Sequence, residues 1–360
     1  MAPAGLLPVP DVLPAFPPVR WAAAYGSAAL QQAGYSTKNN SMVDYIFAVD
    51  SPADWHRGNI AANPSHYSSL KWLGAGVVGH VQEKWASGVY YNTLIDWEGE
   101  QRIKYGVVSV NKLVEDLTEW RHMYLAGRLH KPVITLQADE EIEAAVQVNL
   151  DRALDASRLL LPAEFSKREL FRSAAGLSYL GDYRMQFGEN PKKVHNIVDP
   201  NIDAFTVLYA GALARAGLRV KPAGDAVGVT RIAGPTGTAT RTASVATAGS
   251  GALLQQDTSV AARESILRRL PVHLQQKLLA HAGIAQRSGS GSSSTAVAAD
   301  LQKLGRSAKL RESLTRSVGD IVRQSSKAQS VKALATAGFI KCGIYLMEKL
   351  NRTSKARGSQ

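Results

Sequence analysis

Short apolar runs alternate with helical patterns between Trp21 and Leu136, and this alternation predicts an α/β or α+β domain around a central sheet. The runs typical of strands are Trp21–Tyr25, Val43–Val49, Val89–Ile95, Ile103–Val110 and Val133–Leu136. Helical patterns lie between them at Ala28–Gln32, Ser65–Leu73 and Lys112–Ala126. The dipeptide Glu98-Gly99 predicts a hairpin turn between the third and fourth strands.

The next part of the chain is helical in pattern. The expected helices are Glu140–Leu161, Ser166–Leu180 and Val198–Ala216. Ser166 followed by Glu169 is a capping box, which predicts a helix start at that serine.

Three segments lack such periodicity. Residues 222–260 are rich in Gly, Ala and Thr and predict a flexible insertion. The Gly/Ser run Ser288–Ser294 predicts a linker. The Pro-rich first twenty residues predict a disordered or extended arm, and they match neither a secretory signal nor a transit peptide.

The net charge of +12 comes from the last hundred residues. Residues 261–360 contain 18 Lys and Arg against 5 acids, whereas the first 260 residues contain 24 basic and 25 acidic residues. Such asymmetry implies a surface that meets polyanions, either nucleic acid or an anionic bilayer, although a basic tail that only aids solubility has the same composition. The single cysteine, Cys342, excludes an internal disulfide framework. The sequence contains no run of 18 uncharged apolar residues, so a conventional membrane span is not expected.

The literal G-x-G-x-x-G motif at Gly74–Gly79 is not interpreted as a dinucleotide site. Such a site needs a strand before the glycines and a helix after them, so that backbone N–H groups face a pyrophosphate. The preceding residues Ser65–Leu73 carry no β-branched run and read as helical. The sequence contains no P-loop motif.

A second pattern indicates a phosphate site. The strand Trp21–Tyr25 runs into Gly26 and Ser27, and Asp44 then enters the next strand. Gly26 would let the backbone approach a triphosphate, and Ser27 would offer a donor to its oxygens. An acid such as Asp44 can hold Mg²⁺, which bridges phosphates as pyrophosphate leaves. A plain turn followed by a strand-capping Asp has the same sequence, so this pattern leaves both readings open.

Longer segments resemble the mitochondrial phosphatidate cytidylyltransferases, also called CDP-diacylglycerol synthases or translocator assembly and maintenance proteins. The resemblance covers about residues 21–216 and 318–350. The segments that carry it are Ala24–Ser27, Val43–Asp50, Asn63–Tyr67, Gly88–Asn92, Ile103–Gly106, Ala126–Pro132, Gly176–Met185 and Ile321–Ser326.

The resemblance implies that CTP and phosphatidic acid react to CDP-diacylglycerol and pyrophosphate, with Mg²⁺ or another hard divalent cation, in the supply of cardiolipin and phosphatidylglycerol. It implies an α+β fold, in which a nucleotidyltransferase domain with a central mixed sheet precedes a helical, winged-helix-like domain. It also implies a peripheral protein on the matrix side of the mitochondrial inner membrane, and the basic C-terminal third agrees with an anionic membrane surface as partner.

These considerations predict seven regions along the chain. They are an N-terminal arm at 1–20, the nucleotidyltransferase domain at 21–136, the helical domain at 137–221, the insertion at 222–260, a basic helical region at 261–330, an apolar helix at a membrane surface at 331–350 and a basic tail at 351–360.

The metal site is incomplete relative to the usual nucleotidyltransferase pattern. That superfamily usually carries Asp-x-Asp, and here Met42 stands two residues before Asp44. Asp50 lies about 20 Å further along the same strand, at ~3.3 Å per residue. A second metal-binding acid would therefore come from elsewhere, with Asp96 and Asp182 as the candidates.

The expected catalytic residues are Asp44, Lys104 and Asp182. The expected contacts to CTP and phosphatidate are Tyr25, Gly26, Ser27, Ser65, His66, Asn92, Arg184, Lys192 and Lys193. Two of these assignments have structural alternatives: His66 can be a structural histidine, and Gly181–Arg184 can be a helix cap with an ion pair.

The apolar segment Val331–Leu350 is expected to lie in a membrane interface. Its basic residues would then lie near lipid phosphates, namely Lys332, Lys341, Lys349 and, just beyond it, Arg352. The alternative is a core helix that closes the first domain.

Two other functions remain open at this level. One is a nucleotidyltransferase fold that acts on nucleic acid, although Phe339 and Tyr345 are the only aromatic residues in the basic C-terminal region, so stacking platforms for bases are scarce and no nucleic acid is expected. The other is a membrane adaptor without catalysis, for which the missing acid at Met42 would be the signature.

Overall fold

The computed structural model describes residues 5–33, 42–99, 101–187, 190–221, 245, 249, 251–284 and 294–337. The expected tail at 351–360, most of the expected insertion and linker, and Lys341, Lys349 and Arg352 lie outside the described residues.

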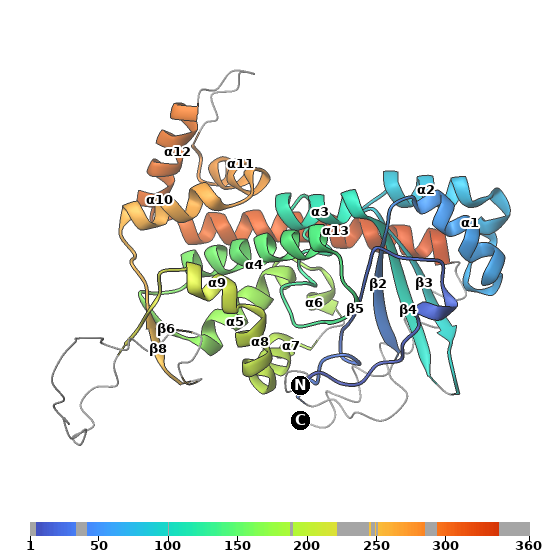
Figure 1. The fold of residues 1–360 in the computed structure, drawn as a ribbon. Helices are drawn as coiled ribbons and strands as arrows, with labels where there is room; N and C mark the ends of the chain where they lie inside the picture. Colours follow the sequence, from blue (N-terminus) through green and yellow to red (C-terminus); the bar gives the residue numbers. More distant parts are fainter. Residues whose placement is uncertain are drawn as a thin grey trace, which may run out of the picture.

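A five-stranded mixed sheet forms one part of the molecule (Figure 1). The strand order is β3-β4-β2-β1-β5; β2 and β4 run parallel, and the other neighbouring pairs run antiparallel. The five expected strands are confirmed, each with ends within one residue of its prediction, and so is the β3–β4 hairpin. The bounds are β1 Trp21–Tyr25, β2 Val43–Val49, β3 Val89–Asp96, β4 Arg102–Ser109 and β5 Ile134–Gln137.

Alternate residues along the strands point into two different cores. On one face, Ile46 and Val108 join a large core that continues into the helical part. On the other face, Phe47 and Tyr105 join a smaller, aromatic core. Which of these two faces a residue points to decides what it can reach.

The N-terminal segment covers the aromatic face. Val12 and Phe16, on either side of the 3₁₀ helix η1 (Leu13–Ala15), are buried in the smaller core, and the Phe16 ring lies 4.7 Å from that of Tyr105, centroid to centroid. Residues 5–20 therefore differ from the expected disordered arm, because they carry apolar side chains that the sheet face needs as cover.

Two helices that the periodicity did not predict also pack at this face. They are α1 (Pro52–Ala62), which Ser51 caps through the N–H of Asp54, and α2 (Ala75–Lys84). The helix expected at 65–73 is instead two 3₁₀ pieces, η2 (Pro64–His66) and η3 (Ser69–Leu73). A 3₁₀ helix thus precedes the G-x-G-x-x-G motif where a dinucleotide site needs a strand, which agrees with setting that motif aside.

The helical part lies beside the sheet (Figure 1). The capping box at Ser166 and Glu169 is confirmed, because each side chain accepts the other residue's backbone N–H. The helices are α3 Val110–Glu119, α4 Glu140–Leu160, α5 Lys167–Gly176, η4 Leu177–Tyr179, α6 Arg184–Phe187, α7 Lys193–Val198, η5 Asp199–Asn201, α8 Ile202–Leu208, α9 Ala210–Arg215, α10 Val260–Arg269, α11 Val272–His281 and α12 Ser294–Arg306.

A small antiparallel sheet lies within the helical part. Its strands are β6 (Glu164–Ser166), β8 (Leu253–Gln255) and β7 (Arg219–Val220), in the order β6-β8-β7. β8 falls within the expected flexible insertion, and its Leu254 is fully buried in the large core. The end of that insertion is therefore an ordered strand, because it buries a leucine and completes the hydrogen bonds of two neighbouring strands.

The long helix α13 (Leu310–Ala337) joins the two parts of the molecule (Figure 1). It contacts α4 and α11 in the helical part and β3, the outermost strand on one side of the large sheet. The expected boundary at residue 330 falls inside this helix. No helix among the described residues is long and apolar enough to span a membrane.

Lys332 lies inside the protein, in contrast to the expectation that it faces lipid. Its side chain is fully buried, and its ammonium group donates hydrogen bonds to the carbonyls of Gln82 (2.9 Å) and Trp85 (2.7 Å) at the end of α2. For this part of the segment, the alternative of a helix packed on the first domain is the one observed.

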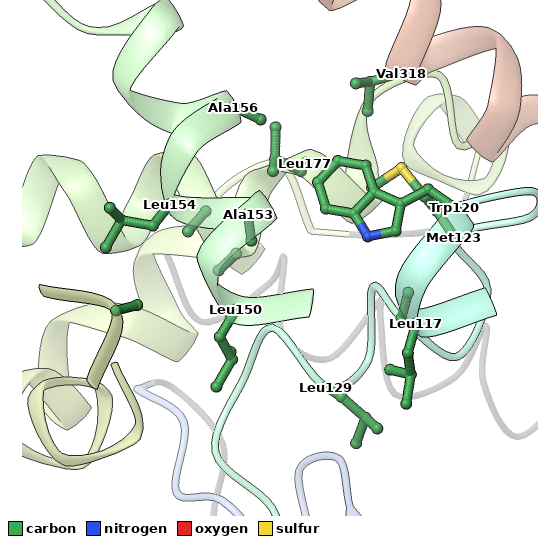
Figure 2. Close-up of a cluster of buried hydrophobic side chains, with 14 of the residues drawn as sticks. Leu117, Trp120, Met123, Leu129, Leu150, Ala153, Leu154, Ala156, Leu177 and Val318 are labelled. Atoms are coloured by element: carbon green, nitrogen blue, oxygen red, sulfur yellow. The ribbon is translucent and has the colours of Figure 1, made fainter. Parts of the chain in front are cut away.

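The large core is continuous from the sheet into the helices. Trp120, at the end of α3, lies among Met123, Leu177 and Val318, which come from three other segments (Figure 2). Its indole N–H donates to the Asn149 side chain of α4 at 2.8 Å. The regions expected as two domains therefore share one core.

Candidate active site

The neighbouring strands β1, β2 and β4 bring Tyr25, Asp44 and Lys104 together at one edge of the large sheet, where β1 ends and β2 and β4 begin. Tyr25 ends β1 and pairs with Asp44 near the start of β2, and Asp44 pairs with Lys104 on β4. Residues paired in this way project from the same face of a sheet. The Nζ atom of Lys104 lies 3.1 Å from Oδ1 of Asp44, and both side chains are partly exposed. A ligand can therefore reach this ion pair.

Gly26 forms the turn next to the Asp44 carboxylate. Its φ of +86° lies in the left-handed region, which glycine adopts without strain. A Cβ atom here would lie 3.2 Å from Oδ2 of Asp44. The helix expected at Ala28–Gln32 is a single turn, in which the Gly26 carbonyl accepts the N–H groups of Ala29 and Leu30. The side chain of Ser27 is exposed on this turn.

Tyrosine rings and an arginine lie next to Lys104. The Lys104 ammonium lies 4.7 Å from the ring centroid of Tyr91, whose hydroxyl lies 3.4 Å from that of Tyr25. The guanidinium carbon of Arg128 lies 3.8 Å from the ring centroid of Tyr124 and 5.6 Å from that of Tyr25. Burial raises the pKa of both Tyr25 and Tyr91, so these two rings are neutral at physiological pH.

Arg128 remains charged although it is partly buried. Burial by itself lowers the pKa of the guanidinium, but the neighbouring Tyr124 and Tyr91 outweigh this effect and raise it above its usual value. Burial likewise opposes ionisation of Tyr124, yet Arg128 and Lys104 together bring the pKa of Tyr124 below its usual value. The local potential therefore favours negative charge beside Arg128.

Two lysines extend this positive region. The ammonium groups of Lys131 and Lys193 lie 5.2 and 5.7 Å from the ring centroid of Tyr179. Burial, together with repulsion from Arg128 and Lys193, lowers the pKa of Lys131 to about 7. Lys131 also donates to the Ser178 hydroxyl at 2.9 Å. Lys192 precedes Lys193 at the start of α7, and its side chain is exposed.

Arg184 belongs to the same positive region, and Asp182 is its counter-ion. The Nη2 atom of Arg184 lies 2.6 Å from Oδ2 of the buried Asp182, and Nε contacts both carboxylate oxygens. This is the structural alternative considered for Gly181–Arg184. The pKa of Arg184 is raised by Asp182 and by Tyr124, in spite of burial, so the guanidinium is charged. The Asp182 carboxylate therefore forms a bidentate ion pair with the Arg184 guanidinium.

Ser65, His66 and Asn92 are not brought to this group. Asn92 is buried on the other face of the sheet, where its amide donates to the Tyr105 hydroxyl at 2.9 Å. The ring of His66 lies 3.0 Å from the same hydroxyl through Nδ1, and Ser65 is exposed beside it on η2. His66 and Asn92 thus contact Tyr105, whereas Asp44 and Lys104 project from the opposite face.

Asp96 lies away from Asp44, although it is on the same sheet. It pairs with Arg102, so it is two strands from Asp44 and two residues further along. This places the Cα atoms about 12 Å apart, at ~4.8 Å per strand and ~3.3 Å per residue. Within the described part of the chain, no group of three or more His, Cys, Asp or Glu side chains comes together as a metal site.

Sequence reasoning missed Tyr91, Tyr124, Arg128 and Lys131. All except Tyr124 lie in segments that carried the family resemblance, Gly88–Asn92 and Ala126–Pro132. No local pattern sets the two basic residues apart, because they lie in a turn after α3 rather than in a strand or a helix.

A buried carboxylate, that of Asp116, holds this turn in place. Oδ2 accepts the N–H groups of Leu125 (2.8 Å) and Ala126 (3.1 Å), and Oδ1 accepts that of His122 (3.1 Å). Backbone N–H groups that lack a helical partner need such acceptors when they are buried. Asp116 thereby positions Arg128 and Lys131 from the end of α3.

An acid–lysine pair at a sheet edge, next to partly buried arginines and lysines, is typical of enzymes that act on phosphate-bearing substrates, because charge-assisted donors of this kind bind phosphate oxygens strongly. Comparison with known proteins identifies the family. The profile of the family described as phosphatidate cytidylyltransferase, mitochondrial, matches residues 9–352.

Curated relatives agree with this match. The mitochondrial phosphatidate cytidylyltransferase of Xenopus laevis is 38% identical over 330 residues, covering 91% of this chain and 88% of the relative. That of Drosophila melanogaster is 38% identical over 345 residues, covering 92% and 93%. The human one is 48% identical over 192 residues, covering 52% and 42%.

The chain belongs to the mitochondrial phosphatidate cytidylyltransferase family. It is a cytidylyltransferase that makes CDP-diacylglycerol, with CTP and phosphatidic acid as its substrates. This result confirms the resemblance found in the sequence and supports neither a nucleic-acid enzyme nor an adaptor without catalysis.

Proposed function

We propose that the sheet edge around Asp44 binds the triphosphate of CTP, and that the adjoining positive region binds the phosphate of phosphatidic acid. The observation that carries this proposal is the contact of Asp44 with Lys104 beside the Gly26 turn. The second group is Arg128, Lys131, Arg184 and Lys193, which come from three segments and converge on the same side.

In the proposed reaction, an oxygen of the phosphatidate phosphate attacks the α-phosphorus of CTP. A new P–O bond forms, the bond from the α-phosphorus to the bridging oxygen of the β-phosphate breaks, and pyrophosphate leaves with that electron pair. Both substrates are anions, so the protein mainly aligns them and neutralises charge. Lys104 would donate to the triphosphate, and Arg128 would hold the lipid phosphate.

We also propose Mg²⁺ or another hard divalent cation as the cofactor. The Asp44 carboxylate fits such a cation, because Mg²⁺ is commonly held by one or two carboxylates together with substrate phosphates and water. When bound, it would neutralise charge on the phosphates as pyrophosphate leaves. Lys104 would then exchange its contact with Asp44 for one with a phosphate oxygen.

The finer assignments of fold and location are part of the same proposal. The mixed sheet that presents Asp44 supports a nucleotidyltransferase-type fold, and the small sheet β6-β8-β7 beside α4 and α5 supports a winged-helix-like second part. The relatives are named as mitochondrial proteins. We place the enzyme on the matrix side of the inner membrane, in the supply of cardiolipin.

The test follows pyrophosphate release from CTP with phosphatidic acid in mixed micelles and Mg²⁺. We expect Asp44→Asn to lower kcat by about a thousandfold or more, because the cation loses its protein ligand. Asp50→Asn is the matched control: it lies on the loop after the same strand, and its carboxylate contacts Arg20 at the surface. Equal activity of the two variants would refute the assignment of Asp44, and release without lipid would refute the reaction.

A further inference from the structure

Large apolar side chains are exposed where η3 turns into α2. Trp72 is 81% exposed and Leu73 is 65% exposed, and both lie at the end of η3. Val77 and Trp85 on and after α2 are also exposed. Gly74, with φ +89°, makes the turn that presents the first two side chains. We call these four residues the η3–α2 patch.

The end of α13 lies against this patch. The Ser68 hydroxyl, at the start of η3, donates to the Thr336 carbonyl at 2.6 Å, and Lys332 binds the Trp85 carbonyl. On this end of α13, Val331 and Leu334 are exposed as well. The chain therefore leaves the described part beside the patch, and the sequence that follows is again apolar, with Phe339, Ile340, Ile344, Tyr345 and Leu346.

Basic residues border the patch. The ammonium of Lys71 lies 5.2 Å from the ring centroid of Trp72, and Lys84 is exposed at the end of α2. Tryptophan next to lysine is typical of surfaces that lie in a membrane interface, where the ring sits at headgroup level and the ammonium reaches lipid phosphates. Exposed apolar clusters of this kind mark interaction sites rather than ordinary surface.

The patch is connected to the aromatic face of the large sheet, which is opposite to the face from which Asp44 and Lys104 project. His66, three residues before η3, contacts the hydroxyl of Tyr105, and Tyr105 follows Lys104 on β4. Docking through this patch would therefore hold the large sheet itself close to the membrane.

We propose that the η3–α2 patch docks the enzyme onto an anionic lipid bilayer, with Trp72 and Leu73 inserted into the interface and Lys71 and Lys84 against lipid phosphates. This inference rests on the proposed function, because a substrate whose acyl chains remain in the bilayer has to be met at the membrane surface. It assigns to an exposed corner the role that the sequence suggested for Lys332, which the fold buries.

The test is flotation of the full chain with phosphatidylcholine vesicles that contain phosphatidic acid. We expect the double variant Trp72→Ser with Leu73→Ser to bind at least about tenfold more weakly, since two apolar side chains no longer leave water. Val207→Ser is the matched control, because Val207 is exposed on α8, outside the patch. Equal binding by the double variant and the control would overturn the proposal.

Fluorescence tests whether Trp72 inserts into the bilayer and whether the chain itself or a second copy covers the patch instead. Brominated lipids should quench part of the tryptophan emission of the wild type, and this quenched fraction should be smaller in Trp72→Phe. An equal quenched fraction in the two proteins would overturn the proposal. Without vesicles, Trp72 should be open to a soluble quencher and the chain should not associate through the patch. Protection from that quencher, or association that the double variant abolishes, would show that the chain itself or a second copy covers the patch, which overturns the proposal.

Turnover of a water-soluble short-chain phosphatidic acid separates this inference from the proposed function. The double variant should retain the wild-type rate on that substrate while it loses activity on vesicles. If the wild type itself does not turn the soluble substrate over, the proposed function is wrong, whereas the flotation result still decides the docking surface. If the double variant loses activity on the soluble substrate as well, the patch acts on catalysis and the docking proposal fails.

Discussion

Several charged side chains at the site are paired with neighbours of opposite charge. Lys104 holds the Asp44 carboxylate at 3.1 Å, and Asp182 holds Arg184 at 2.6 Å. Lys131 differs from both: its pKa is lowered to about 7 by burial and by the nearby Arg128 and Lys193. The negative charge of an incoming phosphate would favour the protonated form of this lysine.

This predicts a pH dependence of lipid binding. Lys131 is charged below pH 7 and loses its proton as pH rises through 7, so the KM for phosphatidic acid should increase above pH 7, by up to about tenfold per pH unit. In Lys131→Arg the charge persists, and the KM should change much less between pH 6 and 8.5. The measurement is steady-state kinetics of both enzymes with the same lipid, so that titration of the lipid phosphate affects both KM values equally. Parallel pH profiles would contradict the prediction.

Among the elements, α13 depends on one close backbone crossing. Gly181, with φ +71°, lies under α13 so closely that a Cβ atom would be 2.2 Å from the Gly319 carbonyl oxygen. The hydroxyl of Tyr183 donates to Ser330 at 2.7 Å further along the same helix. The segment that carries Asp182 and Arg184 is thus positioned by a helix far away in sequence.

Gly181→Ala should lower the free energy of unfolding by about 3 kcal/mol, because the backbone is strained and α13 must move. The matched control is Gly176→Ala at the end of α5, where φ is −66° and no atom lies within 4 Å of the added Cβ. That change should be neutral or stabilising by about 0.5 kcal/mol. Urea unfolding followed by circular dichroism compares them, and similar losses in both variants would show that the crossing is looser than described.

Prediction from periodicity worked better for strands than for the helices around them. Each strand was placed within one residue, because its apolar run faces two cores and is bounded by turn residues. The segment Ser65–Leu73 was expected as one helix and forms two 3₁₀ pieces. α1 and α2 were not predicted, since their apolar faces are short and the partner surface lies elsewhere in the chain.

For the whole molecule, one core runs through both expected domains. Trp21 of the sheet and Val318 of α13 belong to the same cluster of buried residues. α13 and α4 carry that cluster from the helical part toward β3. Separate unfolding of the sheet part and the helical part would expose this shared surface to water, which is unfavourable.

Thermal unfolding should therefore be a single cooperative transition. Tryptophan fluorescence, which reports Trp21 and Trp120 among others, and far-ultraviolet circular dichroism, which reports mostly helices, should have midpoints that coincide. Two separated midpoints, with fluorescence changing before helix content, would show that the sheet and the helices are independent units.

The sequence alone determined the strands, the proximity of Gly26 to Asp44 along neighbouring strands, and the family. These depend on local periodicity, turn chemistry and motif order, all of which are properties of the linear sequence. The positive region around Arg128 and Lys131 was decided by tertiary structure, as was the separation of Asn92 from Asp44. Strand register sets the face to which a residue points, and packing sets which distant turns meet; neither can be read from residues that are neighbours in sequence.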